Sequence, residues 1–428
     1  MVTPAQITPP MSTARAREIA ASFDLRALPA DFLANPYPVY AALRETDPVR
    51  RMPDGSLFLT RHADLMAVYR DAAVFSSDKH AEFAPKYGAG SALYEHHTTS
   101  LVFNDPPLHT RVRKLIMGAL TRRAIADMEP GLIALVDSLL DRIEAQGGGD
   151  LIDDFAAAIP VEIIGNLLGV PHEDRGPLRD WSLAILGALE PVPTPGQHAA
   201  GNRSVTEMLD YLRGLVAERR KMPGDPERDV LTRLIQGEAS GEQLTEVELL
   251  QNCIFLLNAG HETTTNLIGN GLILLQEYPA ARGQLLADLH TAAGEADREQ
   301  VLNLAVDECL RFESSNQLGN RRALAPAAIG GIEVPAGTLV TLCIGAANRD
   351  PAAFAEPQTL NLRRESNRHL AFGFGIHQCA GLSLARLEGR IAIGRFLQRF
   401  PGYQLTAVPV RGGRARFRGF LSAPFTVG

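Results

Sequence analysis

One helical run near the middle of this 428-residue chain constrains its fold more than any other feature. Thr245 and Glu248 form a capping box, in which each side chain can satisfy a backbone N–H of the other residue. A helical apolar pattern continues through Leu275 and ends before Pro279, which interrupts helices. At 1.5 Å per residue, such a helix is roughly 50 Å long. We therefore expect one long helix that crosses the whole protein.

The rest of the chain predicts a mainly α protein with a small β part. Apolar residues recur at helical spacing through much of 130–313. Strand-like runs are few, at Leu57–Leu59, Gly331–Val334 and Thr338–Ile344, and Pro335-Ala336-Gly337 predicts a hairpin between the last two. Because no repeat or linker divides the sequence, we expect a single domain over 35–428, preceded by a loosely ordered N-terminal arm over 1–34.

Composition narrows the class of protein. The net charge of −7 gives no basic footprint for nucleic acid. No stretch of 18 apolar residues predicts a membrane span. The four cysteines lie far apart and form neither a zinc motif nor a disulfide framework. We expect a soluble, monomeric protein of the reducing cytoplasm.

Cys379 stands in a glycine-rich segment, Phe372–Gly381, that leads directly into an amphipathic helix. A lone cysteine is most often a small buried hydrophobe. Here, glycines permit a close approach to the backbone and a helix N-terminus favours the thiolate. The segment is therefore suited to hold a haem iron through Cys379, without thioether bonds because no CxxCH is present.

The centre of the long helix carries polar residues where packing residues are expected. Thr263 can donate its hydroxyl to the carbonyl of Ala259, which tends to bend or open a helix. Gly260 allows a flat group to approach, and Glu262 supplies a carboxyl beside the hydroxyl. The functional interpretation is proton delivery at a cofactor by Glu262 and Thr263. The alternative is a polar helix face turned to solvent.

Both segments resemble motifs of the cytochrome P-450 family. Phe372, Gly375, His377, Cys379 and Gly381 fill its Phe-x-x-Gly-x-His-x-Cys-x-Gly loop. The resemblance implies the cytochrome P-450 fold, with non-covalent haem b between the long central helix and the cysteine-loop helix. It implies Cys379 as the axial ligand, Thr263 and Glu262 as catalytic residues, and cofactor contacts from Ala259, Gly260, Phe372, Gly373 and Gly381.

The resemblance also implies residues that hold the haem propionates. These are His109, Arg113, Arg321 and His369, each of which alone could be an ordinary surface charge. Glu308 and Arg311 resemble the family's Glu-x-x-Arg pair, which braces the haem loop together with a second arginine. Arg364 fits that second arginine best, although Arg363 is adjacent.

The segment after Arg311 departs from the family pattern. A proline and an apolar residue are more usual where Ser315 and Asn316 stand. Asn316, Gln317 or Asn320 is therefore a candidate to orient a polar group of the substrate. The alternative is that these amides only satisfy backbone groups. The loop 79–100, with His96 and His97, is expected to be a lid over the substrate entrance rather than a metal site.

The function expected from these features is that of a haem-thiolate monooxygenase. It would activate dioxygen and hydroxylate or epoxidise a small organic substrate, using electrons from a separate ferredoxin or flavin partner with its reductase. A basic docking patch is predicted from Arg111, Lys114, Arg122, Arg123 and Arg386. Alternatives are a peroxide-dependent haem enzyme and a non-catalytic haem sensor, both of which the Glu262–Thr263 pair disfavours.

Overall fold

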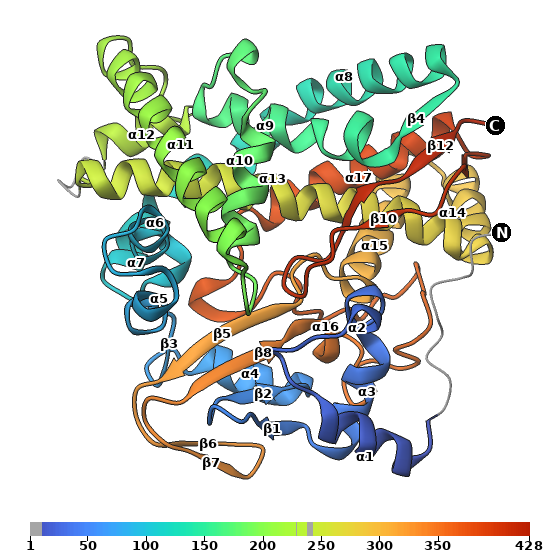
Figure 1. The fold of residues 1–428 in the computed structure, drawn as a ribbon. Coiled ribbons are helices and arrows are strands. Elements are labelled where there is room, and N and C mark those ends of the chain that lie inside the picture. Colours follow the sequence, from blue (N-terminus) through green and yellow to red (C-terminus); the bar gives the residue numbers. More distant parts are fainter. Residues whose placement is uncertain (1–10, 228, 238–242) are drawn as a thin grey trace.

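The long central helix is α13 (Glu246–Glu277), which confirms the expectation from the sequence. The computed structural model describes residues 11–227, 229–237 and 243–428. Both halves of the capping box form, with Thr245 Oγ1 accepting from the Glu248 N–H at 3.2 Å and Glu248 Oε2 accepting from the Thr245 N–H at 2.8 Å. Figure 1 shows α13 running across the molecule between a helical layer and a smaller sheet region. Most of its side chains are buried, because neighbours cover it on several sides.

Helices dominate the chain on both sides of α13. Before it lie α1 (Thr13–Ser22), α2 (Ala30–Ala34), α3 (Tyr37–Thr46), α4 (His62–Arg70), α5 (His80–Tyr87), α6 (Ala92–Thr99), α7 (Leu108–Ala119), α8 (Arg122–Gln146), α9 (Ala158–Leu168), α10 (Leu178–Gly187), α11 (Pro195–Lys221) and α12 (Val230–Gln236). After it lie α14 (Pro279–Thr291), α15 (Glu295–Phe312), α16 (Ile344–Ala347) and α17 (Leu382–Arg399). The mainly α class is as expected. Among the described residues, no helix combines the length and apolarity needed to cross a lipid bilayer.

The main sheet joins strands from both ends of the chain. Its order is β1 (Val49–Arg51), β2 (Leu57–Leu59), β8 (Leu339–Cys343), β5 (Leu318–Ala323) and β3 (Phe75–Ser76). Strand β2 pairs with β8 in parallel, with Leu57 opposite Val340. The smaller sheets comprise β6 (Ala327–Ile329) with β7 (Ile332–Val334), β4 (Gly148–Asp150) with β12 (Pro424–Thr426) and β9 (Gln404–Leu405), and β10 (Val410–Arg411) with β11 (Phe420–Ser422).

Two expectations from the sequence need correction. The predicted hairpin between β7 and β8 does not form, because β7 pairs with β6 while β8 pairs with β2 and β5. The described part of the segment expected to be a loose arm is instead helical. Phe23 and Phe32 from this part are buried in one apolar cluster with Tyr40 of α3 and Phe58 of β2. Burial of these rings explains why α1 and α2 are held against the sheet region.

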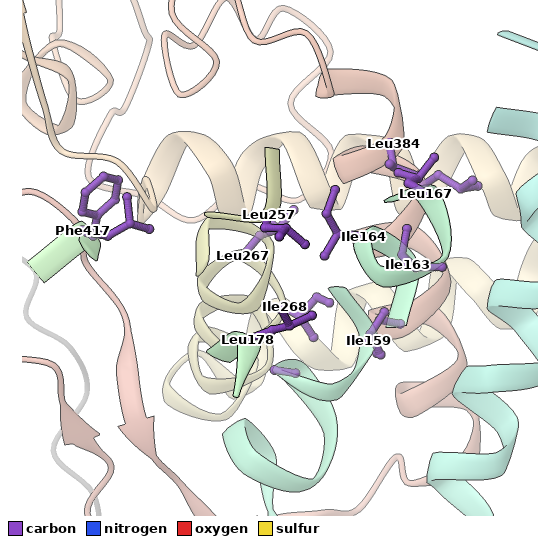
Figure 2. Close-up of a cluster of buried hydrophobic side chains, with 14 of the residues drawn as sticks. Ile159, Ile163, Ile164, Leu167, Leu178, Leu257, Leu267, Ile268, Leu384 and Phe417 are labelled. Atoms are coloured by element: carbon purple, nitrogen blue, oxygen red, sulfur yellow. The ribbon is translucent and has the colours of Figure 1, made fainter. Parts of the chain in front are cut away.

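The principal core lies where α13 meets α9, α10 and α17. Figure 2 shows Ile164 of α9 beside Leu257 and Leu267 of α13, and Leu167 of α9 beside Leu384 of α17. Small residues let α13 and α17 pack closely: a Cβ at Gly389 would meet Leu267 at 3.0 Å, and one at Gly271 would meet Ile393 at 2.7 Å. These contacts fix how the two helices lie relative to each other.

Candidate active site

The cysteine loop places the Cys379 thiol three residues before α17. The backbone N–H of Cys379 donates to the Phe372 carbonyl at 2.9 Å, which closes the loop. Gly373 has a φ of +64°, which a residue with a Cβ adopts only with strain. Burial raises the pKa of the Cys379 thiol, whereas the Gly381 N–H and the guanidinium groups of Arg113 and Arg386 act in the opposite direction. The thiol is half-buried and free of any disulfide.

One face of α13 is open at its centre. Ala259 is exposed and Thr263, one turn further on, is partly exposed, although nearly every neighbour along the helix is buried. Thr263 Oγ1 donates to the Ala259 carbonyl at 3.0 Å, as the sequence predicts. Gly260 faces a different way, since a Cβ there would meet Ile164 of α9 at 3.0 Å. Gly260 therefore serves close packing of α9 against α13 in this structure.

The packing of α13 on α17 brings the two motifs together. Leu267 contacts position 389, and Ile393 contacts position 271, so the two helices run in parallel with matched spacing. The same spacing carried back along both helices takes Ala259 to the level of Gly381, at the start of α17, and Thr263 to the level of Ala385, one turn further along α17. The open face of α13 and the half-buried thiol thus lie at the same end of one helix pair.

Glu262 turns away from Thr263 into a buried polar region. Its carboxylate pairs with Arg414 at 2.5 Å, and burial raises its pKa to about 7 despite this partner. The pair borders a cavity of about 20 Å³, which His261 and Asn266 also line. That volume is enough for about one water molecule. Glu262 Oε2 has no protein partner among the described residues, so it could accept a hydrogen bond from a water in the cavity.

A group of cationic and imidazole side chains gathers beside the cysteine loop. The rings of His109 and His377 lie 4.1 Å apart, and burial lowers the pKa of both. Arg113 and Arg321 act on the pKa of His377 as nearby positive charges. In the described part of the chain, neither arginine forms an ion pair with a carboxylate, and His377 Nε2 is buried without a partner. Two guanidinium groups without a carboxylate partner, beside an unpartnered imidazole nitrogen, suit a dianionic group such as a pair of propionates.

His369 does not join this group, contrary to the prediction. Its Nε2 lies 3.4 Å from a carboxylate oxygen of Asp307, and its Nδ1 accepts from the Ala371 N–H. Its ring packs 5.7 Å from the ring of Phe372, which also lies under the Arg386 guanidinium. Both ring nitrogens of His369 are therefore occupied within the protein, and His377 stands where a propionate ligand was expected.

Glu308 is the centre of a buried charge network. Arg311 binds both of its carboxylate oxygens at 2.8 Å, and Arg364 donates to Oε2 at 3.0 Å. Arg363 points elsewhere and pairs with Asp288. Arg311 also donates to backbone carbonyls of Asn348, Pro357 and Thr359. The network therefore ties α15 to the chain that leads into the cysteine loop.

The three candidate amides of the substrate segment have different surroundings. Gln317 is completely buried and donates to the Ser314 carbonyl at 2.7 Å, so it satisfies backbone groups. Asn320 Oδ1 accepts from Arg416 at 2.5 Å. Asn316 Oδ1 is buried without a partner among the described residues. Next to Asn316, the Ser315 hydroxyl donates to the Thr263 carbonyl at 2.9 Å, so this segment abuts the open face of α13.

The expected lid, 79–100, folds as α5 and α6 and packs inward. His96 Nδ1 lies 3.1 Å from Gln251 Oε1 of α13, and His97 is buried among aromatic rings. Within the described residues, no cluster of ligands that could hold a metal ion includes either histidine. Tyr87 donates to the Ala188 carbonyl at 2.8 Å, which joins α5 to the loop after α10.

The site combines the thiol of the cysteine loop with the Thr263 face of α13. Arg113 and Arg321, which have no carboxylate partner among the described residues, lie beside the loop. The orphan donors and the open helix face fit a flat, dianionic, thiolate-ligated cofactor, and haem has these properties. The arrangement defines the class of haem-thiolate oxidoreductases.

Comparison with known proteins agrees with this class. The family model described as Cytochrome P450 matches residues 183–406. The biotin biosynthesis cytochrome P450 of Bacillus subtilis is 33% identical over 378 residues, which cover 88% of this chain and 91% of that protein. The cytochrome P450 monooxygenase PikC of Streptomyces venezuelae is 36% identical over 394 residues, with 90% and 89% covered.

Solved structures match over nearly the whole chain. P450BioI, crystallised with hexadec-9Z-enoic acid ligated acyl carrier protein, has a TM-score of 0.84 at 33% identity and covers 93% of this chain and 99% of its own. The myxobacterial CYP267B1 in complex with myristic acid has a TM-score of 0.83 at 31% identity, with 93% and 98% covered. The chain belongs to the cytochrome P450 family. It is a haem-thiolate monooxygenase that binds haem non-covalently and acts on small substrates.

The sequence did not predict the contacts that three residues of the site make. Arg414 and Arg416 lie more than 90 residues from the groups they contact, so no local pattern links them to Glu262 or Asn320. Their alternation with Arg418 was the available signal. His377 was noted as part of the loop motif, but its contact with His109 depends on how α7 meets the loop.

Proposed function

We propose that Cys379 is the axial ligand of the haem and that Thr263 acts on the opposite face. The observation that carries this proposal is the parallel packing of α13 on α17, which supports placing the open helix face opposite the thiol. When bound, the haem supplies the activation of dioxygen and its insertion into the substrate. Phe372, which packs between His369 and Arg386, would shield the sulfur from water.

Glu262 and Thr263 would move protons to the distal side. A carboxyl with a pKa of about 7 can both hold and release a proton near neutral pH. Arg414 holds the carboxylate in place, and the adjacent cavity offers a position for a water. Ser315 fixes the Thr263 carbonyl, and the Thr263 hydroxyl, which donates to the Ala259 carbonyl in this structure, would turn from that carbonyl to donate on the distal side. The presence of this pair favours dioxygen over peroxide as the oxidant, and turnover over sensing.

His109, Arg113, Arg321 and His377 would hold the propionates. Ala259, Gly373 and Gly381 would lie against the ring, and Glu308, Arg311 and Arg364 would brace the loop from behind. We also propose that Asn316 faces the substrate, since its amide oxygen is buried and unpaired. Asn320 Oδ1 already accepts from Arg416, and Gln317, whose Oε1 is also unpaired among the described residues, is completely buried and donates to the Ser314 carbonyl.

A basic surface near the cysteine side would receive the redox partner. Lys114, Arg122 and Arg123 are exposed, and Arg111 and Arg386, which pair with Glu248 and Asp307, are partly exposed. Attraction of an acidic ferredoxin or flavin protein would depend on the positive charge that these five residues present together. The domain limits of 35–428, a monomeric state and a cytoplasmic location remain predictions.

The test of the proposed function is the difference spectrum of the ferrous–carbonyl form. A Soret band strongly red-shifted from that of histidine-ligated haem is expected for the wild type. Cys379→His should keep haem bound, lose this band and lose oxygen insertion. Full monooxygenase activity in Cys379→His would overturn the assignment.

A further inference from the structure

Arg414, Arg416 and Arg418 occupy alternate positions in the segment before β11. Among the described residues, the guanidinium of Arg416 is the one of the three without a carboxylate partner. Arg414 pairs with Glu262 at 2.5 Å, and Arg418 pairs with Glu313. Arg416 forms no ion pair with any carboxylate in the part of the chain that the structure describes. The same short segment therefore carries two neutralised guanidinium groups and one that is not neutralised.

The guanidinium donors of Arg416 meet neutral oxygens only. Its Nε donates to the Leu189 carbonyl and its Nη1 to the Leu318 carbonyl, both at 3.1 Å. Its Nη2 donates to Asn320 Oδ1 at 2.5 Å. These bonds hold the planar group in one orientation, yet they supply no negative charge. A fixed, partly buried guanidinium without a counter-ion is costly unless an anion joins it.

Two lysines of the lid region add to the same charge. Lys79 is buried and lies 2.9 Å from Glu82. Lys86 donates to the Glu190 carbonyl at 2.7 Å, while the Glu190 carboxylate accepts the backbone N–H groups of Ala415 and Arg416. We call Lys79, Glu82, Lys86, Glu190 and Arg416 the cation cluster. It contains three cationic side chains and two carboxylates, which leaves one positive charge in excess when Lys86 is protonated.

The lowered pKa of Lys86 is consistent with an excess of positive charge in the cluster. Burial, followed by the charge of Arg416, lowers the pKa of Lys86 to about 7. The Glu82 and Glu190 carboxylates oppose this shift but do not cancel it. Buried His97 is held neutral, since burial and the neighbouring charges, Lys86 and Arg416 among them, lower its pKa. An added anion would relieve the repulsion between Lys86 and Arg416.

The cation cluster is joined to the reacting side of the molecule through the residues that precede β5. The Gln317 N–H donates to the Arg416 carbonyl at 2.8 Å, and Asn316 forms an isolated antiparallel β-bridge with Phe417. Two residues before Gln317, Ser315 binds the carbonyl of Thr263. The cluster and the open face of α13 are thus connected within a few residues of the same segment.

We propose that the cation cluster binds the carboxylate of a monoanionic organic substrate, with Arg416 and Lys86 as its direct partners. This inference rests on the proposed monooxygenase function and names the substrate class for it. Guanidinium geometry matches a carboxylate, which can accept two parallel hydrogen bonds. One excess charge matches a carboxylate better than a phosphate dianion. The substrate is held by its acid group, so oxidation occurs at a carbon away from that group.

The experiment compares acids with their neutral methyl esters on the haem-loaded protein. Myristic acid and cholic acid, each beside its methyl ester, are titrated by calorimetry and by the spin-state shift of the haem spectrum. In the wild type, at least one acid should bind about tenfold or more tightly than its ester, as expected for a charge-assisted hydrogen bond. Equal affinity within both pairs, or binding of neither acid, would overturn the proposal.

The variants separate charge from packing. Arg416→Gln and Lys86→Met should each weaken binding of the acid about tenfold and leave the ester within about twofold. Arg213→Gln removes an exposed guanidinium of α11 and should change neither ligand. Equal losses for acid and ester in the first two variants would show a packing role and contradict the proposal. Haem content of each variant, measured alongside, should equal that of the wild type.

Failure of this inference is distinguishable from failure of the proposed function. If acids bind in the expected pattern but are not oxidised with a redox partner present, the cluster stands and the monooxygenase assignment does not. If esters and acids bind alike and are both oxidised, the assignment stands and the cluster has no part in substrate choice.

Discussion

The charge network around Glu308 and the cation cluster around Arg416 are built from the same residue types but are balanced differently. In the Glu308 network, one carboxylate accepts from two guanidinium groups, and the backbone N–H of Asn361 and the Asn367 amide complete its shell. In the cation cluster, the guanidinium of Arg416 donates only to neutral oxygens. A buried charge with every donor matched serves the fold, whereas a buried charge in excess points to a ligand from outside the chain.

The largest effect is expected from breaking the balanced network. Glu308→Ala leaves Arg311 and Arg364 buried without a counter-ion and should lower the free energy of unfolding by about 3–5 kcal/mol. Haem content of the purified protein should fall with it, because the network braces the chain before the cysteine loop. Urea unfolding and the pyridine haemochrome assay measure the two effects. A loss below about 1 kcal/mol would contradict the structural role.

Glu388, a buried carboxyl group without a cationic partner among the described residues, contrasts with the paired Glu308. Glu388 of α17 is buried, its Oε2 has no partner among the described residues, and burial raises its pKa to about 8. The folded protein therefore retains a proton that the unfolded chain, with a pKa near 4.3, releases. Stability from this group is present at low pH and is lost as pH rises towards 8. Between pH 5 and 7 it should contribute a decline of about 3 kcal/mol in the free energy of unfolding.

Glu388→Gln tests that dependence. The variant should be more stable than the wild type at pH 7 and show a flatter profile of unfolding free energy between pH 5 and 7. Urea titrations at several pH values measure the slope. An unchanged slope would mean that Glu388 is ionised within the folded protein.

A smaller effect is expected from removing the excess cation. Without ligand, Arg416→Gln should change the free energy of unfolding by less than about 1 kcal/mol, since lost hydrogen bonds are offset by relief of repulsion. The pKa of Lys86 should rise from about 7 towards its usual value, because Arg416 is one of the charges that lower it. Isotope-edited NMR of the methylated lysine reports this pKa. A large loss of stability would place Arg416 with the balanced network instead.

The smallest effect is expected at the exposed pair that neighbours the Glu308 network. Arg363→Gln breaks the contact with Asp288 at the surface and should alter stability by no more than about 0.5–1 kcal/mol. Comparison with Arg364→Gln, one residue away and bound to Glu308, is the matched control. Similar losses for the two variants would remove the distinction between them.

Local rules predicted those parts of the molecule whose contacts are local. The capping box, the apolar run and Pro279 fixed α13, and the bond from Thr263 to Ala259 follows from a spacing of four residues. Strand β5 escaped notice because its middle residues are polar and half-buried, and only pairing with β3 and β8 makes it a strand. Partners such as Glu262 and Arg414 could not be predicted, since they meet across 152 residues.

The choice between His369 and His377 shows the same limit. Both stand in the motif region, and each could reach a propionate as far as spacing is concerned. The Asp307 carboxylate contacts His369 Nε2, so His369 is not available to a propionate. The two residues are 62 positions apart, one in α15 and the other before the cysteine loop. A pattern of residue types contains no information about which side chain a distant carboxylate has already engaged.

Arg418 also sets an order for the completion of the fold. Besides Glu313, its guanidinium donates to the carbonyls of Leu33 and Ala34 at the end of α2, both at 2.8 Å. During synthesis on the ribosome, α1 and α2 emerge long before Arg418, so this junction can close only after the segment that carries Arg418 has been made. Until then the carbonyls of Leu33 and Ala34 lack this partner, so a part of the fold that is made early is among the last to be secured.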